Sequence, residues 1–133
     1  MIKKIVIIED ETSISEMYKF KLEAEGYKVT TAANSWDGLV LVDKVRPDLL
    51  LLDIMMPYET GDVTLEKLRA TEFGKNLKVI MMTNTEAQDA SPTIKQLGIK
   101  RFVIKATMTP GQVAIMVKDE LADKRRVAAL ATI

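Results

Sequence analysis

Residues 48–57 read DLLLLDIMMP, and this stretch decides how the rest of the chain is interpreted. Four consecutive leucines without polar alternation are typical of a strand that is covered on both faces of a parallel sheet. The run ends at a carboxylate, Asp53. Because a buried carboxylate without a partner costs free energy, this aspartate needs either solvent or a neighbouring cation. The stretch therefore predicts a central strand that ends at a chemically significant side chain.

The same kind of apolar run occurs five times along the chain. Longer amphipathic stretches separate the runs, which are IVII (5–8), VTTAA (29–33), LLLL (49–52), VIMM (79–82) and FVI (102–104). Strands that alternate with helices form parallel sheets with helices on both faces. The sequence therefore predicts an α/β fold of the (βα)5 type, a doubly wound five-stranded parallel sheet with the flavodoxin-like strand order 2-1-3-4-5.

Capping residues predict where helices begin between these strands. The signals are Ser13 with Glu16, Ser35, Ser91-Pro92, and Thr109-Pro110 with Gln112. A Ser or Thr followed three residues later by Glu or Gln forms a capping box, and proline is favoured in the first helical turn. The signal at Ser91 would start the fourth helix late and leave residues 84–90 as a longer loop.

The composition is that of one ordinary globular domain. The chain has 133 residues, with 19 Lys+Arg and 19 Asp+Glu, so no net charge favours binding to nucleic acid or to a membrane surface. It contains no cysteine and no histidine, which excludes disulfides, thiolate metal sites and catalysis by histidine. Residues 1–10, MIKKIVIIED, are too short and too soon acidic for a signal peptide, and we expect a cytoplasmic domain.

Chemically active residues follow four of the predicted strands. They are Glu9 and Asp10 after the first strand, Asp53 at the end of the third, Thr83 after the fourth and Lys105 after the fifth. In open α/β sheets, ligands bind outside the carboxyl ends of the strands. Each residue alone would be unremarkable on a surface, but five at equivalent strand ends predict a site.

The residue types indicate the chemistry of this site. Clustered carboxylates raise one another's pKa unless a cation lies among them, and oxygen ligands without histidine or cysteine favour Mg²⁺. A carboxylate oxygen of Asp53 can then act as a nucleophile toward a phosphoryl group. Mg²⁺, the ammonium of Lys105 and the hydroxyl of Thr83 can stabilise charge on the phosphoryl oxygens. In this interpretation Asp53 is exposed at its strand end.

Over nearly its whole length the sequence resembles the receiver domain of bacterial two-component response regulators. The matching motifs are the pair Glu9-Asp10, DIMMP followed by Gly61, Thr83 after two methionines, and RFVIK, residues 101–105. The resemblance implies that Asp53 is the phosphoacceptor and that Lys105 contacts the phosphoryl group. It implies that Mg²⁺ is bound by Glu9, Asp10, Asp53 and the backbone carbonyl of Met55. It also implies that Thr83 is the switch hydroxyl and Phe102 the switch aromatic.

The resemblance also implies partners. A sensor histidine kinase or a histidine phosphotransfer protein would donate the phosphoryl group, and a downstream protein would bind the face formed by the fourth helix, fifth strand and fifth helix. The domain would catalyse its own phosphorylation and dephosphorylation without being an enzyme in the usual sense. We expect a monomer or weak dimer, with no nucleic acid or membrane bound by this chain. Residues 1–123 would form the receiver domain, and 124–133 an extension of the last helix or a tail.

Alternative functions remain to be distinguished. A flavodoxin-like cofactor binder would need a phosphate-binding loop after the first strand, where this chain has the acidic EDETS (9–13). A phosphatase of the haloacid dehalogenase type would need a DxD pair, but Ile54 and Met55 follow Asp53. A receiver-like adaptor that is not phosphorylated stays open as the alternative.

Several side chains at the rim carry separate expectations. Asn84 and Ala106 depart from the family pattern, since a small residue usually follows the switch threonine and a proline usually follows the lysine. With alanine in that place, a trans Lys105–Ala106 bond is expected, because a cis bond would cost about 2.5–4 kcal/mol. Lys105 should still reach Asp53 through its long side chain. Met55 should lie at the rim of the site, and Met56 should pack inward. Trp36 and Tyr58 are expected at or near the surface.

Overall fold

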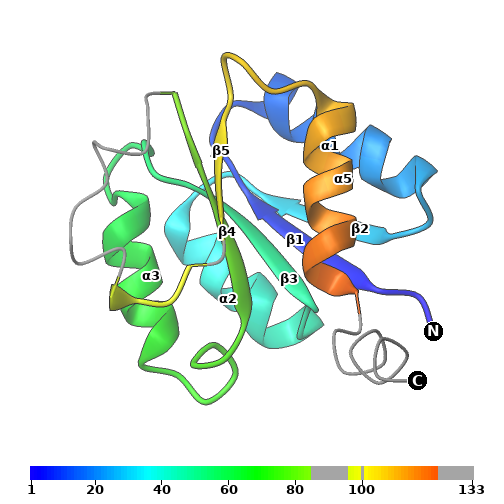
Figure 1. The fold of residues 1–133 in the computed structure, drawn as a ribbon. Helices are drawn as coiled ribbons and strands as arrows, with labels where there is room; N and C mark the ends of the chain where they lie inside the picture. Colours follow the sequence, from blue (N-terminus) through cyan, green and yellow to red (C-terminus); the bar gives the residue numbers. More distant parts are fainter. Residues whose placement is uncertain (85–95, 100, 123–133) are drawn as a thin grey trace.

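The computed structural model describes residues 1–84, 96–99 and 101–122 as an alternation of strands and helices. The strands are β1 (Lys4–Ile8), β2 (Lys28–Ala32), β3 (Leu49–Asp53), β4 (Lys78–Thr83) and β5 (Arg101–Ile104), and the helices are α1 (Thr12–Ala24), α2 (Ser35–Val45), α3 (Gly61–Arg69) and α5 (Pro110–Leu121). All strand pairs are parallel, and the order across the sheet is β2-β1-β3-β4-β5 (Figure 1). The predicted fold class and strand order are confirmed.

The strand β3 lies at the centre of the sheet, and all of its residues are buried. Leu50 pairs with Val6 of β1 on one side and with Val79 of β4 on the other. A strand with neighbours on both edges and helices on both faces has no polar surface to contact. This position explains why the four leucines show no polar alternation.

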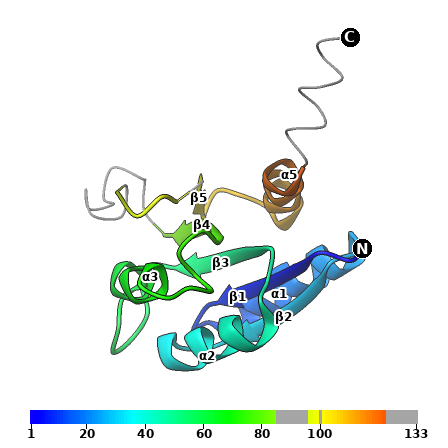
Figure 2. The same ribbon diagram turned by 90° about the horizontal axis from the view of Figure 1, so that it is seen from below.

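Helices cover both faces of the sheet. Successive residues of a strand point to opposite faces, so Leu49 and Leu51 pack with α1 and α5, whereas Leu50 and Leu52 pack with α2 and α3. Figure 2 shows α1 and α5 on one side of the strands and α2 and α3 on the other. The protein therefore has two apolar cores, and burial of both fixes the sheet whose carboxyl edge carries the site.

The predicted starts of two helices are wrong by one or two residues. Helix α1 begins at Thr12, because the backbone carbonyl of Glu11 already accepts the N–H groups of Ile14 and Ser15, and Ser13 lies within the first turn. Helix α2 is capped by Asn34, whose side chain accepts the N–H of Asp37 at 2.8 Å.

The residue predicted to cap α2, Ser35, makes a long-range contact instead. Asn34 is the N-cap, and the hydroxyl of Ser35 instead accepts a hydrogen bond from Thr64 of α3 at 2.8 Å. By contrast, α5 begins as predicted, with Thr109 as N-cap and Gln112 completing the capping box.

The Lys105–Ala106 bond is trans, as predicted.

Two predictions lie outside the described residues, namely the start of a fourth helix at Ser91-Pro92 and the extension at 124–133. Within the described part of the chain, no helix is both long enough and apolar enough to cross a membrane.

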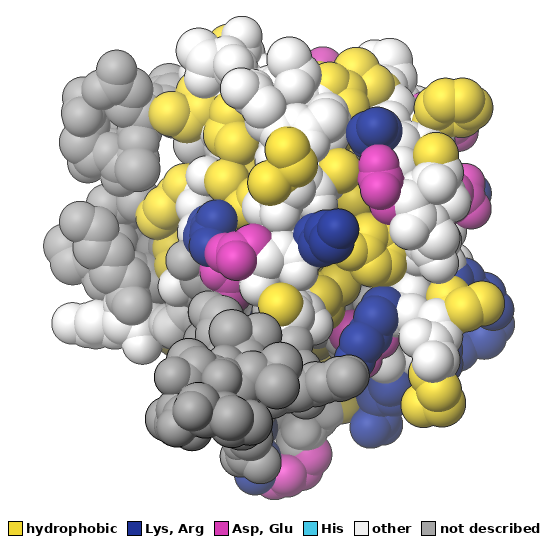
Figure 3. Space-filling view, turned by 45° about the vertical axis from the view of Figure 1, so that its right-hand side comes forward, with side chains coloured by type: hydrophobic (Ala, Val, Ile, Leu, Met, Phe, Trp, Pro, Cys, Tyr) yellow, Lys and Arg dark blue, Asp and Glu magenta, His cyan; other side chains and the backbone are white. Residues whose placement is uncertain are grey.

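The surface over α1 and α5 mixes apolar and charged side chains (Figure 3). Phe20 of α1 and Ile115 of α5 are 80% and 71% exposed. Lys21 and Glu25 pair on α1 at 3.2 Å. This mixture agrees with the equal numbers of acidic and basic residues, and it gives the face no field of one sign.

Candidate functional site

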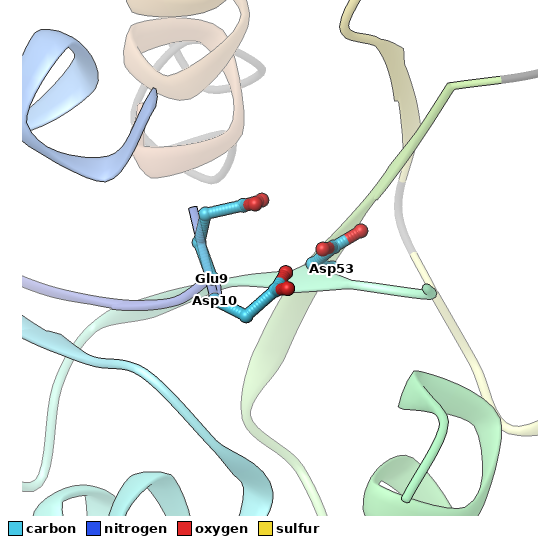
Figure 4. Close-up of side chains that lie close together, drawn as sticks. All are labelled: Glu9, Asp10 and Asp53. Atoms are coloured by element: carbon cyan, nitrogen blue, oxygen red, sulfur yellow. The ribbon is translucent and has the colours of Figure 1, made fainter. Parts of the chain in front are cut away.

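The parallel strands bring three carboxylates together at the carboxyl edge of the sheet. Glu9 and Asp10 directly follow β1, and Asp53 is the last residue of the neighbouring β3. One oxygen from each lies within 4.8 Å of the others, and Figure 4 shows Asp10 and Asp53 approaching each other from the two strands. The structure thus places the predicted acidic residues in one cluster.

Lys105 supplies the positive charge in this cluster. Its Nζ lies 3.1 and 3.0 Å from the two carboxylate oxygens of Glu9 and 3.3 Å from Oδ2 of Asp53. The three side chains are almost fully buried, with exposed fractions of 3% for Lys105, 0% for Glu9 and 1% for Asp53. Lys105 therefore reaches Asp53 although its peptide bond to Ala106 is trans, as predicted.

Asp53 is buried, and the expectation that it would be exposed at its strand end is wrong. Its residue exposure is 0%, because Lys105 lies against it and the chain turns over it immediately after β3. Oδ1 accepts the backbone N–H of Met55 at 3.1 Å. No donor within the described ranges makes a well-aligned hydrogen bond to Oδ2, whose contact is the ion pair with Lys105. This oxygen is therefore the one with unsatisfied capacity for a new ligand.

The electrostatics of the site follow from this arrangement. Burial, and then the charge of Glu9, raise the pKa of Asp53 from 3.8 to about 7, although Lys105 and the Met55 N–H oppose the shift. For Lys105, burial acts to lower the pKa, but the hydrogen bond to Glu9 and the charges of Asp53 and Glu9 outweigh it, and the pKa is raised. The lysine stays charged, whereas the aspartate without a metal exchanges its proton near neutral pH, where both of its forms are populated.

The donor set of the cluster fits a hard divalent cation. All the ligand groups are oxygens, which suits Mg²⁺, and Mg²⁺ needs few protein ligands because it keeps several waters. Since both oxygens of Glu9 already contact Lys105, Asp10 and Asp53 have the carboxylate oxygens best able to bind an ion directly. The Met55 side chain is 64% exposed and Met56 is 6% exposed, as expected for a rim residue and a packed neighbour.

Gly61 holds the loop after Asp53 close to the sheet. Its N–H donates to the carbonyl of Ile54 at 2.8 Å. A Cβ at this position would lie 2.3 Å from the carbonyl oxygen of Asp53 and 2.8 Å from the Cα of Ile54. Only glycine allows this approach without moving backbone, so the eight-residue spacing from Asp53 to Gly61 has a packing reason that the sequence alone did not reveal.

Thr83 and Phe102 lie on the last two strands. Thr83 is 4% exposed at the end of β4, and its carbonyl accepts the N–H of Lys105 at 2.8 Å. Phe102 is partly buried and packs against the core between the sheet and α2 and α3. Thr83 is thus joined through the backbone to the lysine of the site, and Phe102 lies two positions before Ile104, the strand partner of Thr83.

One contact of the site was not predicted from the sequence. Glu9 was considered as a metal ligand, but in the structure both of its oxygens hold Lys105. The pairing joins residues 96 positions apart, so no local pattern indicates it. Only the strand order, which places the ends of β1 and β5 on the same edge, could have suggested it.

The molecule thus combines a doubly wound parallel sheet with an acidic cluster and a lysine at its carboxyl edge. Residues 5–117 match the family described as the response regulator receiver domain, and the chain belongs to this family. It is a receiver domain of the two-component type, and the resemblance seen in its motifs is confirmed.

Relatives of known identity or structure agree with this assignment. The phosphate regulon transcriptional regulatory protein PhoB of Rhizobium meliloti (strain 1021) is 31% identical over 110 residues, which are 83% of this chain and 48% of that protein. The chain therefore spans about half the length of this relative.

Two solved structures share the fold closely. The chemotaxis response regulator CheY4 of Vibrio cholerae has a TM-score of 0.84 and 25% identity, over 91% of this chain and 100% of that one. A CheY-like receiver domain protein from Methanospirillum hungatei JF-1 has a TM-score of 0.82 and 30% identity, over 91% and 94% of the two chains.

Proposed function

We propose that this domain accepts a phosphoryl group on Asp53 in the cytoplasm, from a phosphohistidine of a sensor kinase or of a histidine phosphotransfer protein. The observation that carries the proposal is the contact of Lys105 with both Glu9 and Asp53 in a buried cluster that also contains Asp10. A purely structural carboxylate would be expected to have its oxygens satisfied by hydrogen bonds. Among the described residues, Oδ2 of Asp53 has no hydrogen-bond donor, and its polar contact is the ion pair with Lys105.

The proposed reaction transfers the phosphoryl group to a carboxylate oxygen. An oxygen of Asp53 attacks the phosphorus, a new P–O bond forms, and the bond from phosphorus to the donor's imidazole nitrogen breaks, leaving the electron pair on that nitrogen. Asp53 must be ionised to attack, so its raised pKa makes proton loss part of the preparation for reaction. The Met55 N–H on Oδ1 holds the carboxylate in one orientation.

Two groups balance the negative charge. Mg²⁺ held by Asp10, Asp53 and the backbone carbonyl of Met55 would offset carboxylate repulsion and charge on the phosphoryl oxygens. Lys105 adds a fixed ammonium, and Glu9 keeps this ammonium in place before the substrate arrives. Glu9 therefore acts in the proposal mainly as a positioning residue for the lysine.

Switching is proposed to follow from the new charge on Asp53. The hydroxyl of Thr83 would turn toward the phosphoryl group, and Phe102 would move inward, which changes the face formed by β5, α5 and the segment between β4 and β5. A downstream protein would recognise that face. The relative PhoB is named a transcriptional regulatory protein, but no such output is assigned to this chain, which corresponds to 48% of PhoB.

A labelling experiment tests the proposed acceptor. Incubated with Mg²⁺ and acetyl phosphate, the wild-type protein should gain one phosphoryl group that is stable in acid and lost in base, as measured by intact mass. Asp53→Asn should not be labelled, because an amide is not a nucleophile of this kind. Thr83→Ala serves as the control and should still be labelled. Labelling of Asp53→Asn at the wild-type level would refute the assignment, and absence of labelling in the wild type would favour the adaptor alternative.

A further inference from the structure

Two largely exposed aromatic side chains lie on the edge of the sheet that carries the proposed site. Trp36, at the start of α2, is 76% exposed, and Tyr58, in the loop between β3 and α3, is 106% exposed. Together with Pro57 and Glu59 they line a cavity of about 220 Å³. Aromatic rings contribute stability mainly when they are buried, so rings this exposed add little to the core. Their position on the edge that carries Asp53 calls for another explanation.

Tyr58 is also held in a strained conformation. Its φ is 70°, a value that residues other than glycine rarely adopt. The N–H of Glu59 donates to the carbonyl of Pro57 at 2.8 Å, which closes a turn with Tyr58 at its centre. This is a γ-turn with positive φ, a rare and unfavourable turn. A strained backbone that displays an exposed side chain is a recognised mark of a functional position. Glycine would adopt the same turn without strain, which makes the tyrosine ring a candidate for a binding role.

The base of the cavity is fixed by polar contacts. Lys67 pairs with Glu59 at 2.5 Å, and Lys67 and, secondarily, the Ser35 hydroxyl lower the pKa of Glu59. Ser35 is also bound by Thr64 of α3. Because Ser35 precedes Trp36 and Glu59 follows Tyr58, this network sets the position of the two residues that carry the rings. The cavity is therefore lined by two aromatic residues and by Glu59, whose carboxylate is held by Lys67.

Around the cavity three acids, Asp37, Glu59 and Asp62, outnumber the one base, Lys67, so the local charge disfavours an anion and favours a cation. The first turns of α2 and α3 already contain their own acids, with Asp37 bound to Asn34 and Asp62 bound by Thr60. These acids satisfy the helix N-termini, which would otherwise attract an anionic ligand. The faces of aromatic rings attract cations, and most strongly guanidinium groups. An arginine side chain has an apolar stem for the ring walls and a planar charged end that could share the Glu59 carboxylate with Lys67.

We infer that Trp36, Tyr58 and Glu59 form a pocket for an arginine side chain of the protein that delivers the phosphoryl group to Asp53, an inference that rests on the proposed function. Tyr58 is only five residues beyond Asp53, on the loop that leaves the same strand end. A protein that brings a phosphohistidine to Asp53 must cover this edge of the sheet. The pocket would therefore add a specific contact to the encounter without taking part in the chemistry.

Binding to the pocket can be measured directly, because Trp36 is the only tryptophan in the chain. N-acetylarginine amide should change the tryptophan emission in a saturable manner. The neutral isostere N-acetylcitrulline amide and the apolar N-acetylleucine amide should not. Tyr58→Gly should weaken arginine binding about fivefold, whereas Tyr58→Phe, which keeps the ring, should bind as the wild type does. Equal binding of the leucine compound, or no saturable change up to about 100 mM, would overturn the inference.

Phosphotransfer tests the connection to the donor. The histidine kinases of the source genome would be purified, and the one that labels the wild-type protein fastest would be used. For wild type, Tyr58→Gly and Tyr58→Phe, the rate of phosphorylation by this kinase is divided by the rate of phosphorylation by acetyl phosphate. The ratio should fall about fivefold in Tyr58→Gly alone.

An unchanged ratio would overturn the inference and leave the proposed function intact. If acetyl phosphate labels the protein but no kinase does, the proposed donor class is wrong, and the inference is wrong with it. If neither donor labels the wild type, the proposed function itself fails.

Discussion

The cluster at Asp53 should cost the metal-free protein stability, and Asp53→Asn should therefore stabilise it. The pKa of Asp53 rises from 3.8 to about 7 on folding, a difference of about three pKa units that corresponds to about 4 kcal/mol at pH 8. Relaxation of the site will reduce this value, so we expect a gain of about 1–3 kcal/mol. Lys105 keeps its pairing with Glu9 in the variant, so no buried charge loses its last partner.

Urea unfolding of wild type and Asp53→Asn, with EDTA at pH 8, measures this difference. Mg²⁺ should then reduce or reverse it, because an ion that binds only the folded wild-type protein stabilises it by mass action. The sign at other pH values follows from the raised pKa. Folded Asp53 retains a proton that the unfolded chain has lost, so wild-type stability without metal should fall as the pH rises from about 4 to 7, and the variant should show less of this fall.

A charge-matched control separates the site from net charge. Glu16→Gln also removes one negative charge, but from the exposed side of α1, and it should change the unfolding free energy by less than about 0.5 kcal/mol. The reasoning is refuted if Asp53→Asn is less stable than wild type at pH 8 in EDTA, or if the stability difference does not depend on pH.

Three further predictions follow from the same geometry. The affinity for Mg²⁺, measured by calorimetry, should rise up to about tenfold per pH unit below pH 7 and level off above it, since Asp53 must lose its proton to bind. Thr83→Ala should leave labelling by acetyl phosphate largely intact but should reduce the difference in partner affinity between the two phosphorylation states, which a pull-down with a downstream partner would measure. Gly61→Ala should destabilise the protein by more than about 1 kcal/mol in thermal unfolding, because the new methyl group meets backbone atoms of Asp53 and Ile54. Wild-type stability of Gly61→Ala would show that the loop can move away at little cost.

The sequence predicted the fold well because the relevant signals are local. Continuous apolar runs such as the four leucines before Asp53 occur where a strand is covered on both faces, and Pro110 with its flanking capping residues marks a helix start without help from other segments. Strand ends could then be aligned by the general geometry of parallel sheets. This alignment was sufficient to group Glu9, Asp53 and Lys105 correctly.

What the sequence could not predict depends on contacts between distant segments. Asn34 caps α2, whereas the hydroxyl of Ser35 contacts Thr64, which lies far along the chain. The burial of Asp53 results from the side chain of Lys105 lying against it, which no periodicity describes. The positive φ of Tyr58 was equally hidden, since tyrosine gives no turn signal of the kind that glycine gives.

The ion pair between Glu9 and Lys105 has a consequence for how the chain acquires its site during synthesis. The three acids are encoded within the first 53 residues, whereas the lysine is 96 positions after Glu9. A nascent chain that has emerged only as far as β3 would hold three close carboxylates with no ammonium among them. Their mutual repulsion would be relieved by protonation of Asp53 or, in the complete fold, by Lys105. Because Lys105 directly follows the last strand, the acidic cluster gains its ammonium only when the fifth strand of the sheet is in place.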